Sequence, residues 1–248
     1  MFDIHTTTEH IQSTAGLALA GEIAAKIGLL GYTKQDKRVL GHPEILATLF
    51  GLYIQGRSKY EEIKLFRHDE LFKRALDLRY VPAAETLRLY TEAVAQSKKY
   101  ALGKIRKANT ALLQKTDLTP ISVEGRDYVP VDVDVSPLDN SGSHKEGVSR
   151  TYKGHDGYAP IFSYIGAEGY MLDCDLREGK QHCQKDTPEY LRRNIRTLKK
   201  LTSKTPYLFR LDGGNGGKRD SVVGSDGRLQ HTSLNRSNGT VVYRRVTV

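Results

Sequence analysis

The stretch Pro130-Val131-Asp132-Val133-Asp134-Val135 decides the fold, because apolar residues alternate with aspartates along it. This alternation predicts a β-strand with one buried face and one face that carries carboxylates. A second predicted strand, Tyr207-Leu208-Phe209-Arg210-Leu211-Asp212, also ends in an aspartate. Two strands that each end in an acid are the first indication of a site.

Between these strands the sequence predicts a hairpin and a helix. Ala159–Ile165 and Tyr170–Leu172 are predicted strands joined through the four residues Gly166-Ala167-Glu168-Gly169. The helix begins with Thr187 as N-cap and Pro188 at its first position. Its apolar face consists of Leu191, Ile195, Leu198 and Leu201. The order strand, strand, strand, helix, strand predicts a mixed α/β core of the kind that carries out phosphoryl transfer.

Residues 1–120 are predicted to be helical. Pro43 opens one helix, and short helical segments are expected at Lys59–Phe66 and Asp69–Leu76. A long helix begins after Pro82, and Gly103 is expected to bend or divide it. This part of the chain therefore forms an all-helical region before the predicted sheet.

The long helix has two contrasting faces. Its apolar stripe consists of Leu87, Tyr90, Val94, Ala101, Ile105, Ala108 and Leu112. Such a stripe is either packing surface within a helical domain or a dimer seam, since its spacing is close to a heptad. Its opposite face is basic and consists of Lys98, Lys99, Lys104, Arg106, Lys107 and Lys115. This face is either solvated or follows a phosphate backbone.

The composition indicates which kind of binding partner and which cellular compartment to expect. A formal net charge of +9 on 248 residues points to a polyanionic partner, most simply nucleic acid, and an uninvolved basic surface is the equally weighted alternative. Cys174 and Cys183 are too few for a disulfide framework and wrongly spaced for zinc, so we expect thiols in a reducing cytosol. Glu22 and Lys26 interrupt the apolar stretch Ala15–Leu30, which excludes a membrane span there.

The character of the chain changes after Asp212. Residues 213–248 hold seven glycines in 36 residues and have no helical periodicity. Only Val222-Val223 and Val241-Val242-Tyr243 have the composition of short strands. We therefore expect a non-native or disordered tail over residues 213–248.

Carboxylates at neighbouring strand ends are ligands for divalent cations. A pair of ions about 4 Å apart activates a water or 3′-hydroxyl and stabilises the leaving oxygen of a phosphodiester. Hard oxygen ligands suit Mg²⁺ or Mn²⁺, and a rigid sheet fixes their positions. Asp134 and Asp212 are the candidate ligands. Asp132 shares the strand face of Asp134 and is the second choice, because Asp134 lies nearer the carboxyl end of the strand. For each acid alone, a turn-forming role is the alternative.

A long polar loop, Ser136–Gly157, is predicted to follow the first acid. Its cationic residues Lys145, Arg150 and Lys153 are what a phosphate backbone requires at the mouth of a metal site. A mobile polar loop is the alternative.

Three other aspartates are predicted to lie outside the metal site. Asp139 is expected to form a turn. Asp173 and Asp175 are expected at the exposed surface of an edge strand, with a place near the metals as the alternative.

Longer stretches resemble a known family. They are Val131–Ser143 (VDVDVSPLDNSGS), Lys145–Pro160 (KEGVSRTYKGHDGYAP) and Gly179–Cys183 (GKQHC). They are similar to transposases of bacterial insertion sequences of the thirteen-eighty group, and the similarity covers Met1 to Asp212. The resemblance implies a DDE transposase, in which a ribonuclease-H-like sheet holds Asp, Asp and Glu around two Mg²⁺ ions. In the chain this sheet is preceded by a helical DNA-binding region.

The resemblance also implies roles and partners. Asp134 matches the first acid, and Asp212 matches the second. The implied domains are a helical DNA-binding or dimerisation region (1–120), a partial ribonuclease-H-like core (121–212) and the tail (213–248). The implied partners are the terminal inverted repeats of the element and, for the intact protein, further copies of itself, associated with the nucleoid in the bacterial cytoplasm. The candidate DNA contacts are Lys145, Arg150, Lys153, Lys98, Lys99, Lys104, Arg106 and Lys107.

One family feature is missing from the sequence. The implied third acid is a glutamate after Asp212, yet the last glutamate is Glu189. We therefore expect a truncated or frameshifted transposase, crippled in cleavage and strand transfer, whose fourth strand has an exposed edge. The alternatives are a catalytically inactive DNA-binding fragment that competes with intact transposase, and a stand-alone nuclease that uses Asp220 or Asp226 as its third ligand.

Overall fold

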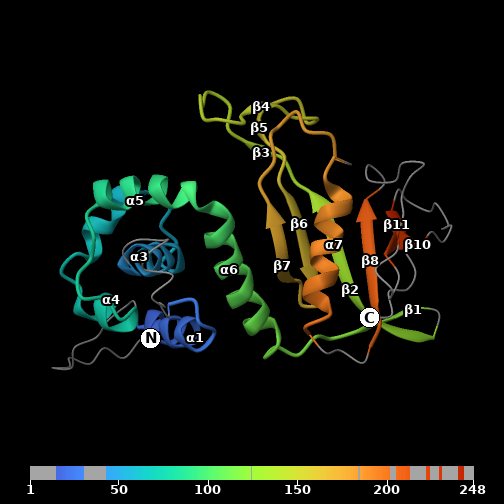
Figure 1. Ribbon diagram of the computed structural model, residues 1–248, viewed down its shortest axis with the longest axis horizontal. Coiled ribbons are helices and arrows are strands. Elements are labelled where there is room, and N and C mark those ends of the chain that lie inside the picture. Colours follow the sequence, from blue (N-terminus) through green and yellow to red (C-terminus); the bar gives the residue numbers. More distant parts are fainter. Residues whose placement is uncertain are drawn as a thin grey trace, which may run out of the picture. The chain divides into compact units, whose positions relative to one another are not determined.

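A computed structural model of the chain divides into two compact units, residues 1–108 and 109–248 (Figure 1). The residues that it describes are 15–30, 43–123, 125–183, 185–201, 205–212, 222–223, 229–230 and 240–242. Within these residues no helix is both long enough and apolar enough to cross a membrane.

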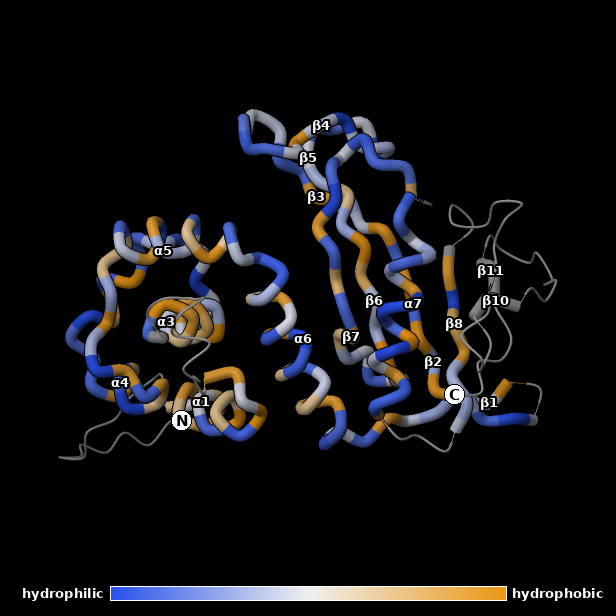
Figure 2. The backbone as a smooth tube through the Cα atoms, viewed as in Figure 1, coloured by the Kyte–Doolittle hydropathy of each residue, from blue (hydrophilic) through white to orange (hydrophobic). Residues whose placement is uncertain are grey.

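The first unit consists of helices around an apolar core, which Figure 2 shows as orange segments. Its elements are α1 (Gly16–Lys26), α3 (Pro43–Ile54), the 3₁₀ helix η1 (Tyr60–Phe66), α4 (Glu70–Ala75), α5 (Ala84–Gln96) and the first part of α6 (Lys98–Leu113). Leu52 of α3, Phe72 of α4 and Leu87 of α5 are fully buried in this core. Gly21 allows α1 to approach α4, because a Cβ there would lie 1.8 Å from the carbonyl oxygen of Ala75.

The predicted long helix is two helices, and the division lies at Ser97 instead of Gly103. The Ser97 carbonyl accepts from the backbone N–H groups of Tyr100 and Ala101, so this residue opens α6 as serine commonly does. Gly103 lies inside α6, where a solvated helix tolerates it. No single helix therefore carries the predicted apolar stripe, and Ile105 within it is 42% exposed.

The second unit contains a six-stranded mixed sheet in the order β11-β8-β2-β6-β7, with β1 paired to β2. The strands are β1 (Ile121–Val123), β2 (Arg126–Val135), β6 (Ile161–Ile165), β7 (Tyr170–Asp175), β8 (Tyr207–Asp212) and β11 (Thr240–Val242). β2 is antiparallel to β6 and parallel to β8, and β6 is antiparallel to β7. The predicted strands and the four-residue connection between β6 and β7 are confirmed.

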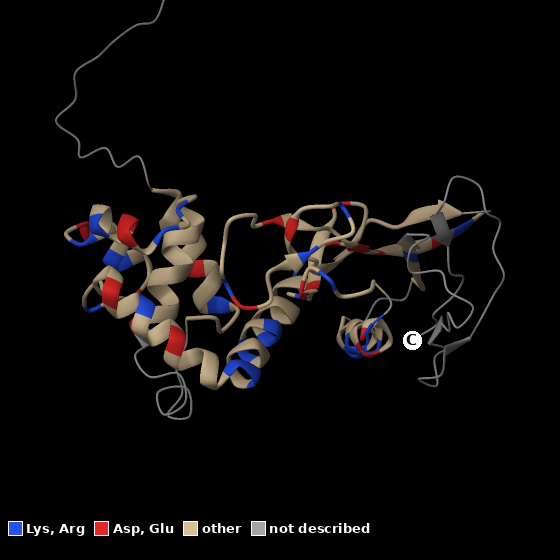
Figure 3. Ribbon diagram, turned by 90° about the horizontal axis from the view of Figure 1, so that it is seen from above, with Lys and Arg blue, Asp and Glu red and all other residues tan. Residues whose placement is uncertain are grey.

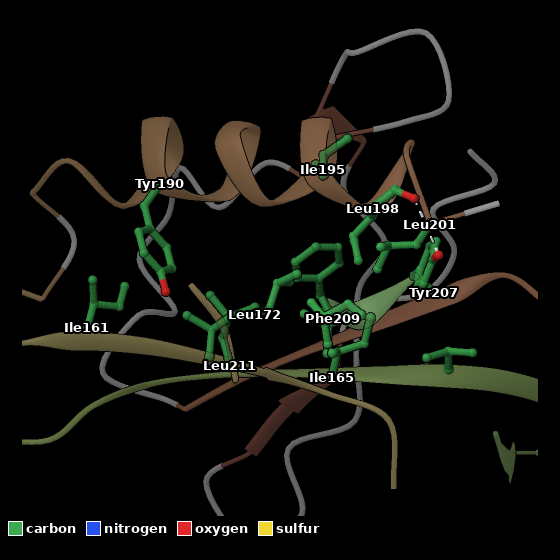
Figure 4. Packing of buried hydrophobic residues seen from close by; sticks show 14 of the residues in the cluster. Ile161, Ile165, Leu172, Tyr190, Ile195, Leu198, Leu201, Tyr207, Phe209 and Leu211 are labelled. Carbon is green, nitrogen blue, oxygen red and sulfur yellow. Dashed lines mark hydrogen bonds between the residues drawn. The ribbon is translucent and has the colours of Figure 1, made fainter. Parts of the chain in front are cut away.

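Helix α7 (Thr187–Leu198) covers one face of this sheet (Figure 4). Ile195 and Leu198 of the helix join Phe209 of β8 and the buried valines of β2 in one core. The helix begins one residue earlier than expected: Asp186, at φ 62°, is the N-cap, and Thr187 is already helical. Because successive side chains of a strand point to opposite faces, the residues between these buried ones lie on the sheet face away from α7.

The predicted loop after the first acid contains a small sheet of its own. Its strands are β3 (Leu138–Asp139), β4 (Ser149–Arg150) and β5 (Asp156–Tyr158), in the order β3-β5-β4. Gly157 permits this pairing, because a Cβ there would lie 1.9 Å from the carbonyl oxygen of Leu138. The residues expected to form an irregular loop are therefore anchored to one another.

Both valine pairs singled out in the last part of the sequence belong to strands. β9 (Val222–Val223) pairs with β10 (Leu229–Gln230), and β11 pairs antiparallel with residues 210–212 of β8. The edge of the fourth predicted strand is therefore paired there, and the expectation of an exposed edge is wrong for these residues. Tyr243, Asp220 and Asp226 lie outside the described residues.

Candidate active site

The two candidate acids of β2 lie on the sheet face opposite α7. Val131, Val133 and Val135 are buried in the core, so the alternation of the strand places Asp132 and Asp134 on the other side. The same rule applies to β8, where Phe209 and Leu211 are in the core and Arg210 lies between them.

Asp132 is neutralised by an arginine on the neighbouring strand. Asp132 and Arg210 are direct partners in the parallel β2–β8 pairing. The guanidinium donates from Nε to Oδ1 and from Nη2 to Oδ2, both at 2.5 Å. The Asp132 carboxylate raises the pKa of Arg210. Both oxygens of Asp132 are thus engaged by a resident cation.

Asp134 is exposed and has no cationic partner among the residues that the structure describes. Its Oδ2 accepts a hydrogen bond of 2.7 Å from the hydroxyl of Ser136, which leaves Oδ1 without a hydrogen-bond donor in the described region. Of the two β2 acids, Asp134 is therefore the one whose carboxylate is available to a ligand.

The strand register brings Asp212 beside Asp134. Val133 pairs with Leu211, and one further residue along each parallel strand brings Asp134 level with Asp212. Neighbouring strands lie about 4.8 Å apart, so these two positions are adjacent on the same sheet face. The pair of acids at the ends of the first and fourth predicted strands is thus brought together by the backbone.

The small sheet returns to the end of β2. The hydroxyl of Tyr152 donates to the carbonyl oxygen of Val135 over 3.3 Å, while 70% of the residue surface stays exposed. The three cationic candidates Lys145, Arg150 and Lys153 are all exposed on this segment. An aromatic ring and three cations therefore belong to the segment that begins two residues after Asp134, at Ser136.

A comparison with protein families decides the identity. The family model described as "Transposase DDE domain group 1" matches residues 3–222. The chain belongs to this transposase family. The match spans both compact units and includes Asp134 and Asp212. No curated protein and no solved structure matches the chain.

The three aspartates of this transposase that are predicted to lie outside the metal site each have other partners. Asp139 accepts from the backbone N–H of Ser141 at 2.8 Å, which confirms the expected turn and lowers the pKa of its carboxyl. Asp173 is on the edge strand as expected but is not exposed, since its side chain is only 8% accessible. Arg193 of α7 donates to Asp173 and to Asp175, both at 2.6 Å. Neither of these two acids belongs with Asp134.

The basic residues of α6 differ in exposure. Lys98, Lys99 and Lys107 are exposed, whereas Lys104 and Arg106 are half-buried. Figure 3 shows several blue segments along this helix. The exposed lysines are therefore the stronger DNA-contact candidates in this part of the transposase.

The donor chemistry of Asp134 fits a ligand of a divalent cation. The Asp134 carboxylate offers a hard oxygen on an exposed face, and the register supplies Asp212 beside it. No group of three or more His, Cys, Asp or Glu side chains with metal-binding geometry occurs in the described part of the chain. Among the described side chains, Asp134 therefore fits one protein ligand of such an ion, and hydrated Mg²⁺ commonly takes few.

Proposed function

We propose that this transposase carries out metal-dependent DNA strand cleavage and strand transfer at the ends of an insertion sequence of the thirteen-eighty group. Asp134 and Asp212 would be the first and second acids. The observation that supports this proposal is the β2–β8 register, which pairs Val133 with Leu211 directly before the two acids. Arg210 forms an ion pair with Asp132 and so engages the other candidate acid of β2. The mixed strand order β8-β2-β6-β7 supports a ribonuclease-H-like core.

Mg²⁺ or Mn²⁺ would be held by the carboxylates of Asp134 and Asp212. When bound, such an ion supplies an activated water or hydroxyl and neutralises charge on the phosphodiester. The protein contributes orientation, because the Ser136 hydroxyl fixes one Asp134 oxygen. Arg150 and Lys153, exposed on the adjoining small sheet, would bind backbone phosphates.

We further propose that this chain cuts DNA poorly. From Tyr190 to Val248 the sequence contains no glutamate, so these residues hold no counterpart of the third acid that the resemblance implies. The loss of one group from a preorganised site commonly lowers the rate by orders of magnitude. Residual cleavage by this chain would therefore be slow even when DNA is bound.

The second candidate function is a DNA-binding protein without catalysis that competes with intact transposase. The exposed lysines of α6 and the missing glutamate favour it. In this role the helical region of residues 1–120 would bind the terminal inverted repeats in the nucleoid and pair with other copies of the chain.

A cleavage assay distinguishes catalysis from DNA binding alone. Its substrate is end-labelled DNA that carries the element's inverted repeats, and Mg²⁺ or Mn²⁺ is added. Nicking that disappears in Asp134→Asn but persists in the control Asp139→Asn, which alters only a turn acid, would support catalysis. Equal nicking by wild type and Asp134→Asn would refute the assigned site. Retained DNA binding without any nicking would favour the competitor.

A further inference from the structure

The Arg210–Asp132 pair lies directly before the proposed metal ligands on the same sheet face. Asp132-Val133-Asp134 and Arg210-Leu211-Asp212 have the same spacing, and the strands run parallel. One cross-strand row therefore pairs a cation with an anion, and the next row pairs two anions.

These two rows have different electrostatic consequences. Opposite charges directly across two strands stabilise the pairing, and like charges destabilise it. Without the guanidinium of Arg210, three carboxylates would lie on two adjacent strands, within about 8 Å of one another. Asp132 would then be a competing ligand for any cation that enters at Asp134.

The pair is not needed to hold the strands together. β2 and β8 share a hydrogen-bonded ladder, and Val131, Val133, Phe209 and Leu211 are buried on the α7 side. In contrast, the Arg210 and Asp132 side chains are 38% and 41% exposed. Interactions this exposed contribute little to stability, so the charge of Arg210 acts mainly on its neighbours at the site.

We propose that Arg210 is a positioning residue that keeps divalent cations away from Asp132 and confines them to Asp134 and Asp212. Its guanidinium engages both oxygens of Asp132 and leaves the Asp134 carboxylate untouched. The inference rests on the proposed metal site and assigns a role that the two acids alone do not explain.

Isothermal titration calorimetry with Mn²⁺ on the full chain tests the role of Arg210. Wild type is compared with two single variants and with the double variant that combines them. Arg210→Gln should bind Mn²⁺ about five- to tenfold more tightly, because a positive charge about 7 Å from the ion is lost. Asp132→Asn should bind it more weakly by a similar factor, because Arg210 is then uncompensated. The double variant Asp132→Asn/Arg210→Gln should return to the wild-type affinity.

Two further variants separate this role from general effects. Arg196→Gln removes the same charge from the exposed face of α7 and should leave Mn²⁺ affinity unchanged. Arg210→Lys keeps the charge but loses the two-point contact with Asp132, so its Mn²⁺ affinity should lie between those of wild type and Arg210→Gln. Thermal unfolding of each variant establishes that it is folded.

The double variant gives the decisive outcome, because it leaves the net charge of the protein unchanged and alters the size of the two side chains little. If it loses Mn²⁺ binding as completely as Asp134→Asn does, Asp132 is itself a ligand and the proposal is wrong. If Arg210→Gln binds no more tightly than wild type, the proposal is also wrong. A third outcome separates the two proposals. If wild type and Asp134→Asn bind Mn²⁺ equally, the proposed metal site is wrong. If Arg210→Gln then gains a Mn²⁺ site that is lost when Asp132→Asn is added, the role of Arg210 is still supported.

Discussion

At the scale of single residues, the choice between Asp132 and Asp134 depends on a partner from another strand. Both acids lie on one strand face, so alternation alone leaves them equivalent. Arg210 engages Asp132 and leaves Asp134 exposed. The sequence contains one indication of this ion pair, because Arg210-Leu211-Asp212 has the same spacing as Asp132-Val133-Asp134. That spacing predicts the pair only once the two strands are known to be parallel neighbours.

The same contacts predict opposite effects of two similar substitutions on stability. Asp132→Asn should lower the free energy of unfolding by about 0.5–1 kcal/mol, a value reduced because the ion pair is half exposed. Asp134→Asn should leave it unchanged or raise it, because one of two adjacent like charges is removed. Urea unfolding at neutral pH without divalent cations measures both. A larger loss in Asp134→Asn than in Asp132→Asn would contradict the assignment.

At the scale of elements, α7 was predictable from its apolar spacing, and its polar contacts were not. The hydroxyl of Tyr190 lies 2.8 Å from both Ser163 Oγ and the carbonyl oxygen of Asp173, and Arg193 stacks over its ring at 5.0 Å. Asp173 looked like a surface acid because sequence spacing does not reveal which helix residue lies above an edge strand. Burial accordingly raises the pKa of Tyr190.

Tyr190→Phe should therefore destabilise the protein by about 1–2 kcal/mol, because a buried hydroxyl that donates at 2.8 Å is lost. Tyr152→Phe is the matched control: its hydroxyl bond is longer, at 3.3 Å, and its residue is exposed, so about 0.5 kcal/mol or less should be lost. Chemical denaturation of both variants gives the comparison. Equal losses would mean that the contacts of Tyr190 add nothing to those of an exposed tyrosine.

The β6–β7 connection predicts a dependence of stability on pH. Glu168 accepts hydrogen bonds from the side chain and the backbone N–H of Thr119, and these bonds lower its pKa below the usual 4.5. A lowered folded-state pKa means that the unfolded chain binds the proton more tightly. The stabilisation is thus fully present above about pH 4.5 and is lost as the pH falls through the lowered value.

Glu168→Gln should accordingly be less stable than wild type at pH 7, and the difference should shrink as the pH falls below about 4.5. Urea midpoints measured from pH 7 to pH 3 test this, with Glu146→Gln, an exposed glutamate of the small sheet, as the control. A difference that stays constant over the whole range would rule out the role of the ionised Glu168 carboxylate.

At the scale of the whole molecule, the order of elements was predictable and several of their boundaries were not. The break at Ser97 was missed because Gly103 is the stronger helix breaker by propensity, while a cap depends on local backbone bonds. The small sheet after Asp134 was missed because each strand has only two or three residues, too few to show alternation. The pairing of β11 with β8 connects segments whose spacing carries no periodic signal.

The net charge of +9 predicts salt-dependent DNA binding in which α6 takes part. Lys99→Glu/Lys107→Glu should weaken binding and reduce the slope of log affinity against log salt by about 2, one for each phosphate contact. Lys64→Glu/Arg67→Glu changes the charge equally elsewhere in the helical unit and should leave the slope near wild type. Filter binding across a salt series provides the measurement, and equal slopes for both variants would exclude a specific role of α6.

We propose that the transposase holds a divalent cation at Asp134, beside Asp212, and not at Asp132. The position of a bound cation can be located by the anomalous scattering of Mn²⁺ in crystals of the full chain. We expect a peak about 2.0–2.3 Å from an Asp134 carboxylate oxygen, with the Arg210–Asp132 pair intact. A peak on Asp132 with Arg210 displaced, or a peak only at Asp173 and Asp175, would contradict it.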